Sequence, residues 1–197
     1  MTGTMQEKKA GRPRDAGKDA LIADAMLRML AKHGYEGASF EKVAAKAKVS
    51  RASIYRRWRS KEDLVIHAIG EMLRAEARDG ADITGTGIPA IRQMLTRTAE
   101  RLSDPFKRRV IAAVLSEAAS RPALAALGAR LEQERRTPLL IALTQARADG
   151  SLPSGQTDEY LADALAGALY FRALVAQTPL TDAVIDGLIA SVLQPSG

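Results

Sequence analysis

The chain has 197 residues, a net charge of +6 and no cysteine, which excludes disulfide bonds and thiolate chemistry. Hydrophobic residues make up 46% of the chain, enough for a sizeable core. The chain contains no run of about 18 apolar residues, so we expect no membrane-spanning helix. The first residues, MTGTMQEKKAGRPRD, lack the apolar segment of a secretory signal, so we expect a cytoplasmic protein without a membrane partner.

Positive charge is concentrated at the front of the chain. Residues 1–61 contain 15 Lys and Arg against 6 Asp and Glu, a net charge of +9, whereas the remaining residues carry −3. A basic front third on a mildly acidic body favours contact with a polyanion at one end of the molecule. A solvated, lysine-rich surface would show the same composition, so charge alone does not decide between the two.

Helical periodicity runs through the chain without strand-like alternation, which predicts an all-α fold of about nine helices. Gly34 is placed to end the first helix in a left-handed conformation. Ser39 and Ser50 are good N-caps for the next two helices, which a tight turn joins. Ser60, with Asp63 three residues later, starts a fourth helix that extends to about residue 78.

The rear of the chain contains five further helical patterns after the linker DGADITGTG. They cover about 88–103, 105–120, 122–148, 157–176 and 181–193. Prolines and glycines separate them, as expected of residues that end helices. Pro138 falls inside the third of these patterns and should kink or divide that helix.

The segment SRASIYRRWRSKEDL concentrates four arginines, a tyrosine and the only tryptophan of the chain. At about 100° per residue, Ile54 and Trp58 share one face and hold the segment to the protein. The opposite face carries Ala52, Ser53 and Arg56, and it is flanked by Arg51, Tyr55, Arg57 and Arg59. Small residues let the backbone approach base edges, and Arg51 or Arg56 can pair with guanine in two hydrogen bonds. A basic helical hairpin of another kind is the alternative that this spacing leaves open.

The front of the chain carries an ordered set of motifs: GRPR, then HGYEGAS, then FEKVAAKAKVSRASIYRRWRSKEDL. These motifs resemble the TetR family of bacterial transcriptional regulators. The family pattern is met by Gly34, Tyr35, Ser39, Val43, Ala44, Ala47, Val49, Ser50, Tyr55, Lys61 and Leu64. Lys48 stands where the family commonly has glycine, so this lysine is expected to adopt an unusual backbone conformation. Ile54 and Trp58 replace leucine and phenylalanine, which keeps the clamp apolar.

The resemblance implies which residues contact DNA. The family's phosphate-contacting positions are matched by Ser39, Tyr55, Arg57 and Lys61. Its groove-reading positions are matched by Ser50, Arg51, Ala52 and Ser53. Arg56 on the same helix, and Arg12 and Arg14 in the N-terminal arm, complete the expected DNA-binding set. For the arm, a disordered and solvated tail is the alternative.

The resemblance also implies a C-terminal helical domain that dimerises and often binds a small-molecule inducer. The helix at 157–176 is apolar nearly all round, so we expect it to be buried on both sides. With the helix at 181–193 it would form a four-helix interface in a homodimer. The expected interface residues are Leu161, Ala164, Leu165, Ala168, Val175, Ile185, Leu188, Ile189 and Val192. A monomer with a deep core is the alternative.

Apolar residues of the rear helices are also candidates for the lining of an inducer pocket. Its candidate residues are Met94, Phe106, Ile111, Leu115 and Phe171. At this spacing such residues are also typical of plain core. Aromatic residues are only 4% of the chain, which favours a small or aliphatic ligand over a flat multi-ring one. Arg172 could bind an anionic ligand, but pairing with Asp163 or with an acid at the interface is the favoured interpretation.

The predicted organisation has four parts. Residues 1–14 form a flexible basic arm, 15–60 a helix-turn-helix DNA-binding domain, 61–78 a linking helix, and 79–197 a regulatory and dimerisation domain. The predicted function is that of a sequence-specific DNA-binding repressor, released from a pseudo-palindromic operator by a small-molecule inducer. An architectural, non-specific DNA-binding protein without inducer response is the alternative. The sequence has only two histidines, no glycine-rich phosphate loop and no cluster with the spacing of metal ligands. We therefore expect that the protein is not an enzyme and binds no metal or cofactor.

Overall fold

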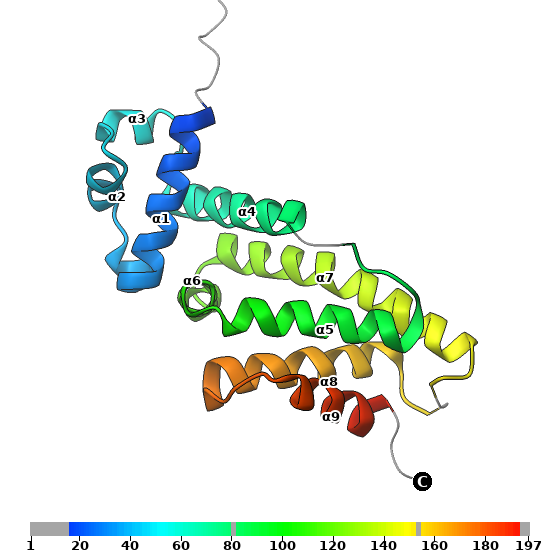
Figure 1. Ribbon diagram of the computed structural model, residues 1–197. Helices are drawn as coiled ribbons and strands as arrows, with labels where there is room; N and C mark the ends of the chain where they lie inside the picture. The colour runs from blue at the N-terminus through cyan, green and yellow to red at the C-terminus, as the bar shows by residue number, and fades with distance from the viewer. Residues whose placement is uncertain (1–15, 80–81, 153–154, 194–197) are drawn as a thin grey trace, which may run out of the picture.

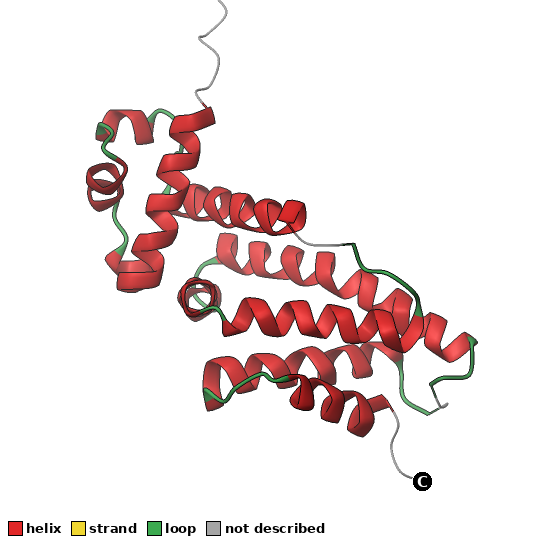
Figure 2. Cartoon of the chain, viewed as in Figure 1, coloured by secondary structure: helices red, strands yellow, loops and turns green. Residues whose placement is uncertain are grey.

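The computed structural model describes residues 16–79, 82–152 and 155–193 (Figure 1). Within these ranges the chain forms nine α-helices and one π-helical segment and no strand, which confirms the all-α prediction (Figure 2). None of the helices in the described ranges has the length and apolar character needed to span a membrane. The predicted basic arm, with Arg12 and Arg14, lies outside the described residues.

Three helices form one end of the molecule (Figure 1). The first, α1 (Ala16–Gly37), is interrupted at Gly34, whose φ of 67° is the positive backbone angle predicted for this glycine. Next, α2 (Phe40–Ala47) begins after Ser39, whose hydroxyl accepts a hydrogen bond from the N–H of Lys42. The third, α3 (Arg51–Tyr55), begins after Ser50, whose hydroxyl accepts from the N–H of Ser53. Both predicted N-caps are confirmed.

The recognition segment is shorter as a helix than the sequence indicated. Only residues 51–55 are α-helical, and the chain then turns through Arg56 and Arg57 before Trp58. The turn that leads into α3 passes through Lys48 in the left-handed conformation (φ 55°, ψ 43°), as expected from the missing glycine. Next, α4 (Lys61–Asp79) starts with Ser60 accepting from the N–H of Asp63, the predicted cap.

The other helices form a layered bundle (Figure 1). They are α5 (Gly87–Ser103), α6 (Pro105–Ala118), α7 (Pro122–Ala148), α8 (Asp158–Tyr170), the π-helical segment η1 (Phe171–Ala176) and α9 (Asp182–Leu193). The helix expected at 157–176 is confirmed as one continuous segment over 158–176, whose last part, η1, is π-helical. Likewise, α7 continues through Pro138, so the proline does not divide it.

Two hydrophobic cores hold the molecule together. The first core contains residues of the four helices α1, α2, α3 and α4. It also includes α6 and the start of α7, through Val110, Val114, Leu124 and Leu127. The second joins α5, the rest of α7, α8, η1 and α9. The first core thus crosses the division that the sequence predicted between the helix-turn-helix and the regulatory domain. A change in α6 therefore acts directly on the packing of α1.

Candidate DNA interface, ligand cleft and dimer face

Two apolar side chains fasten α3 to the protein. Ile54 is fully buried and Trp58 is 7% exposed. The Trp58 ring packs against the His67 ring of α4, with 5.3 Å between ring centroids. The predicted inward orientation of both residues is confirmed. Because α3 has only five residues, this anchoring rather than helix propensity sets its position.

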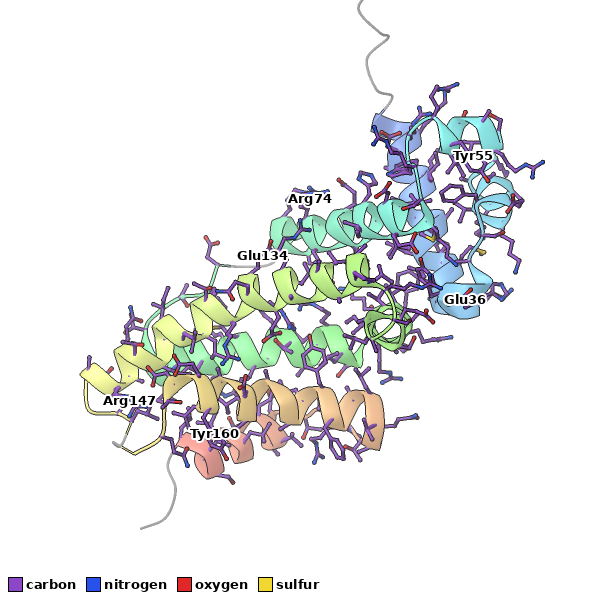
Figure 3. All side chains as sticks on the ribbon, turned by 180° about the vertical axis from the view of Figure 1, so that it is seen from behind. Glu36, Tyr55, Arg74, Glu134, Arg147 and Tyr160 are labelled. Atoms are coloured by element: carbon purple, nitrogen blue, oxygen red, sulfur yellow. The ribbon has the colours of Figure 1, made fainter. Side chains whose placement is uncertain are left out.

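The opposite side of α3 faces solvent. Arg51, Ala52 and Arg56 are exposed, and Tyr55 is 57% exposed while its ring edge contacts Phe40 of α2. Arg51 lies 3.2 Å from the Glu41 carboxylate, but both side chains are exposed, so the pair is weak. Figure 3 shows Tyr55 at the end of the molecule formed by α2 and α3. Small and cationic groups therefore lie together on an accessible surface.

The capping serines remain able to act on this surface. Ser39 and Ser50 accept hydrogen bonds from backbone N–H groups, and the Ser50 and Ser53 hydroxyls lie 3.1 Å apart. A hydroxyl that accepts through a lone pair still has a proton to donate. Capping and donation to a phosphate oxygen are thus compatible at Ser39 and Ser50.

Arg57 does not point outward as predicted. Its Nε donates to Asp19 of α1, its guanidinium donates to the Ser53 carbonyl, and its side chain is 14% exposed. Such a partly buried charge-assisted pair ties α3 to α1. The Asp19 partner was missed because it lies 38 residues earlier in the chain, where no periodicity connects the two.

Lys61 is also occupied within the protein. Its Nζ donates to the Tyr35 carbonyl at 3.0 Å and lies 3.9 Å from the Tyr35 ring centroid. Its nearest carboxylate, that of Glu36, is 4.0 Å away. The prediction of an outward phosphate contact for Lys61 is corrected in the same way as for Arg57: the lysine stacks on an aromatic face at the start of α4.

Tyr35 is the centre of a polar junction between α1, α4 and the turn from α6 to α7. Its hydroxyl donates to Glu62 at 2.6 Å, and Arg121 lies over the ring at 4.4 Å from the centroid. Arg121 also pairs with Glu36, Glu62 and Glu117. Burial, and then the hydrogen bond to Glu62, raise the pKa of the Tyr35 phenol; the same bond is the largest cause that lowers the pKa of Glu62. The junction joins the end of α1 to the helices behind it, where Figure 3 labels Glu36.

A cleft of about 1650 Å³ opens between α4, α5, α6, α7 and α8. Four of the five predicted pocket residues line it: Met94, Ile111, Leu115 and Phe171. Phe106 does not line the cleft, because it packs against the first core. The sequence missed the contribution of α4, whose Ile69, Met72 and Leu73 form one wall.

Charged side chains gather at one part of the cleft wall. Glu76 of α4 accepts from Arg101 of α5 at 2.8 Å and lies 3.0 Å from the Nζ of Lys107 on α6. These two contacts tie α4 to the helices behind it through one carboxylate. Periodicity places each of the three residues on its helix but cannot bring them to one point.

The expected pairing of Arg172 with Asp163 is wrong. Asp163 pairs with Arg136 of α7, because that helix packs against the side of α8 on which Asp163 lies. Within the described residues, the Arg172 Nε is buried without a hydrogen-bond partner. Over residues 16–79, 82–152 and 155–193, no group of three His, Cys, Asp or Glu is placed to hold a metal ion.

The residues expected at a dimer interface divide into two sets. Leu161, Leu165, Ile185 and Ile189 are buried in the second core of one protomer and cannot form a partner-facing surface. The other five are half-buried or exposed: Ala164, Ala168, Val175, Leu188 and Val192. The fault in the prediction is physical, since an all-apolar helix does not reveal from sequence which side its own protomer covers.

The exposed sides of α8, η1 and α9 nevertheless form an apolar surface. The residues at this surface recur at helical spacing: Tyr160, Ala164, Gly167, Ala168, Phe171 and Val175 on α8 and η1, and Val184, Gly187, Leu188 and Ser191 on α9. Tyr160, Phe171 and Val175 are each more than half exposed. Large exposed apolar side chains at helical spacing on two contacting helices are typical of an interaction surface, although Phe171 and Val175 also line the cleft.

Known proteins match this chain along nearly its whole length. The tetR family of bacterial regulatory proteins matches residues 22–68, and the tetracyclin repressor-like C-terminal domain matches residues 84–192. An uncharacterized HTH-type transcriptional regulator of Mycobacterium tuberculosis is 32% identical over 194 residues, covering 95% of this chain and 93% of the relative. The chain belongs to the TetR family.

A second relative supports the assignment, and a solved structure supports the fold. The DNA-binding transcriptional repressor TetR of Mycobacteroides abscessus is 31% identical over 182 residues, covering 88% of this chain and 90% of that protein. A TetR-family regulator structure from Rhodococcus sp. has a TM-score of 0.76 at 18% identity, covering 90% of this chain and all of that chain. The TetR-family protein described here is thus a helix-turn-helix transcriptional regulator, and nothing supports the non-specific architectural alternative.

Proposed function

We propose that this TetR-family protein is a dimeric repressor in the bacterial cytoplasm. It occupies a pseudo-palindromic operator through α3 and leaves it when a small molecule enters the cleft behind α4. The observation that carries the proposal is the orientation of α3, with Ile54 and Trp58 buried and a cationic side exposed. A segment this short is held in place by the buried Ile54 and Trp58, and the exposed Arg51 and Arg56 are available to a polyanion.

The proposed DNA contacts follow from exposure. Arg51 and Arg56 are the candidates for pairing with guanine, and Ala52 lets the helix approach the groove. The Tyr55, Ser39 and Ser50 hydroxyls would donate to phosphate oxygens, with Ser53 beside them at the start of α3. Arg57 and Lys61 would act instead by holding α3 and α4 in place, since both are engaged within the protein. Arg12 and Arg14 keep their predicted roles in the arm.

A dimer through α8 and α9 would present two copies of α3 to two half-sites. The apolar surface of α8, η1 and α9 supports this arrangement, because burying Phe171 and Val175 against a second copy removes apolar area from water. A two-fold axis would make this surface self-complementary. An operator with matching half-sites follows from that symmetry.

The cleft supports ligand control. It borders α4, which begins at the DNA-binding end and carries Glu76 near its other end. A ligand changes operator affinity only if it binds two arrangements of the protein unequally. A cleft with a wall made by the linking helix meets that requirement, because its occupant touches the element that would move.

Selection of duplexes bound from a random pool tests the proposal. We expect a pair of two-fold-related half-sites about one helical turn apart or a multiple of it, bound roughly 10³-fold or more tighter than bulk DNA. Arg51→Ala should relax base choice at one position of each half-site by about 1–3 kcal/mol. Equal affinity for all duplexes would instead indicate an architectural protein.

Arg74→Ala provides the matched control. Arg74 is also an exposed arginine paired with a surface glutamate, Glu71, but it lies on α4 away from α3 (Figure 3). Its loss removes the same charge as the loss of Arg51. Because Arg74 lies away from α3, the Arg74→Ala variant should keep the base choice of the wild type. Equal relaxation of base choice in both variants would contradict the role assigned to Arg51.

A further inference from the structure

We infer that the cleft takes an amphipathic acid, with an aliphatic body and an anionic head, and that the head displaces Glu76 from Arg101 and Lys107. The inference rests on the proposed function, because it names the ligand class of the same cleft and the way in which that ligand releases α4.

The head site already holds a carboxylate. Arg101 and Lys107 reach Glu76 from two different helices, at 2.8 and 3.0 Å. The Glu76 side chain is 18% exposed and both cations are also largely covered, so the contacts are made with little water around them. Two partly desolvated cations that converge on one carboxylate would hold another carboxylate in the same geometry.

The charges around this point leave a cationic excess. Arg97, one turn before Arg101 on α5, also lines the cleft. Most of the cleft's acids have other partners: Asp104 caps α6, Glu132 pairs with Arg135, Asp163 with Arg136 and Glu134 with Arg130. Glu100 and Asp82 are exposed to solvent. Glu76 is thus the covered carboxylate that Arg101 and Lys107 contact, and Arg97 adds a further cation to the lining of the same cleft.

The body site extends from the head along two helices. Toward the start of α4, Leu73, Met72 and Ile69 follow Glu76 at the spacing of one helix face, and all line the cleft. Toward the end of α6, Ile111 and Leu115 follow Lys107 at four and eight residues and also line it. A ligand whose head lies between the cations would therefore lay its tail along aliphatic side chains.

Displacement of Glu76 would free the far half of α4. The near half of α4 holds the DNA-binding end, where His67 packs on Trp58. With Glu76 released, α4 loses its ion pairs with α5 and α6, so ligand and operator affinity become coupled through this helix. Coupling of this kind is reciprocal: the factor by which the ligand lowers operator affinity is the factor by which the operator lowers ligand affinity.

Binding of three probes with the same tail tests the head. Dodecanoate and dodecyl phosphate below their micelle-forming concentrations, and dodecanol below its solubility limit, are titrated into the full-length protein, with calorimetry and Trp58 fluorescence as readouts. At least one anion should bind roughly tenfold or more tighter than dodecanol. Tighter dodecanoate assigns a free acid, and tighter dodecyl phosphate assigns a phosphorylated lipid. Equal binding of all three, or no binding of either anion, overturns the inference.

Glu76→Gln tests the exchange, because it removes the competing charge and keeps the shape. We expect the favoured anion to bind roughly tenfold tighter to this variant, with the affinity for dodecanol unchanged. Arg101→Gln should lower the affinity for the anion. Glu134→Gln, an exposed glutamate on another wall of the cleft, is the matched control and should bind as the wild type does. An unchanged anion affinity in Glu76→Gln overturns the exchange, and misfolding cannot imitate the expected gain.

The operator measurement separates this inference from the proposed function. If the wild type selects one pseudo-palindromic duplex but binds neither anion, the ligand class is wrong and the repressor proposal stands. If an anion binds through Arg101 but DNA is bound without sequence preference, the repressor proposal fails and the acid site stands. If both hold, the favoured anion should lower operator affinity in the wild type and not in Arg101→Gln.

Discussion

Lys48 is an exposed lysine in the left-handed region, between the two helices that must be set at a fixed angle to read DNA. A residue with a Cβ pays about 1–2 kcal/mol to adopt this conformation, whereas glycine adopts it freely. The lysine N–H is nevertheless used, since it donates to backbone carbonyls at the end of α2. The turn therefore keeps its geometry at a cost in stability.

Lys48→Gly should raise the free energy of unfolding by about 0.5–1 kcal/mol, because relief of the left-handed strain exceeds the entropy that glycine loses. Lys46→Gly makes the same change on the helical part of α2 and should lower it by a similar amount. Thermal unfolding of both variants measures the difference. A loss of stability in Lys48→Gly equal to that in Lys46→Gly would refute the strain.

Single residues were predictable where the cause is local. Ser39 and Ser50 cap the helices that follow them, and Trp58 lies on the face that its spacing from Ile54 requires. Arg57 was not predictable, because adjacent arginines look alike and the partner that turns one of them inward, Asp19, comes from another helix. Local chemistry thus specifies backbone geometry, whereas packing decides which cation remains available.

At the scale of the element, α8 and α9 each carry an exposed glycine in a helix interior. A Cβ added at Gly167 or Gly187 would meet no atom within 4 Å in the protomer, so the fold itself does not require either glycine. Each costs about 1 kcal/mol relative to alanine. Close approach of a second copy would explain a glycine at both positions, and Gly167 also lines the cleft.

Replacing both Gly167 and Gly187 by alanine should therefore weaken dimerisation while favouring the helices. We expect the dimer dissociation constant to rise roughly tenfold or more, measured by sedimentation equilibrium. Gly128→Ala on α7, where a Cβ also meets nothing, should favour its helix and leave dimerisation unchanged. A double variant that dimerises as the wild type does would exclude this face as the interface.

At the junction around Tyr35, the Glu62 carboxylate of α4 contacts Tyr35 of α1 and Arg121 of the turn between α6 and α7. Since the folded state lowers the pKa of Glu62 below the unfolded value of about 4.3, Glu62 stabilises the fold above that pH. This contribution is lost as the pH falls through the folded-state pKa. The wild type should therefore lose more stability than Glu62→Gln between about pH 6 and about pH 3.

Urea unfolding followed by Trp58 fluorescence at several pH values measures this loss. Glu134→Gln controls for the removal of one carboxylate from an exposed helix surface. Parallel stability curves for the wild type and Glu62→Gln over the acid range would show that the junction does not depend on the ionised carboxylate.

At the scale of the whole molecule, the arrangement of the cores limits what sequence could predict. The order and approximate bounds of the helices follow from periodicity and breakers, as α5, α6 and α9 illustrate. The sharing of Val110 and Leu124 with α1 does not, because it depends on which helix faces which. For the same reason, Glu76 could be placed on a helix but not beside Arg101 and Lys107.

The long helix α7 offers a direct test of the two cores, because it enters both. Leu124 and Leu143 are fully buried on the same helix, the former in the core shared with the DNA-binding end and the latter in the core of the rear helices. Truncation of either to alanine leaves a cavity and should cost about 2–5 kcal/mol where it lies. Trp58 belongs to the first core and reports on its unfolding.

Leu124→Ala should therefore shift the Trp58 unfolding transition to lower urea, although the leucine lies more than sixty residues away in the chain. Leu143→Ala should shift it less, provided that the rear core unfolds as a separate unit. If Leu124→Ala does not change the urea midpoint of the Trp58 transition, the three front helices fold without the rest of the chain. Equal shifts in both variants would mean that α7 joins the two cores into one cooperative unit, and a ligand-driven movement of α4 would then have to be shared by the whole protein.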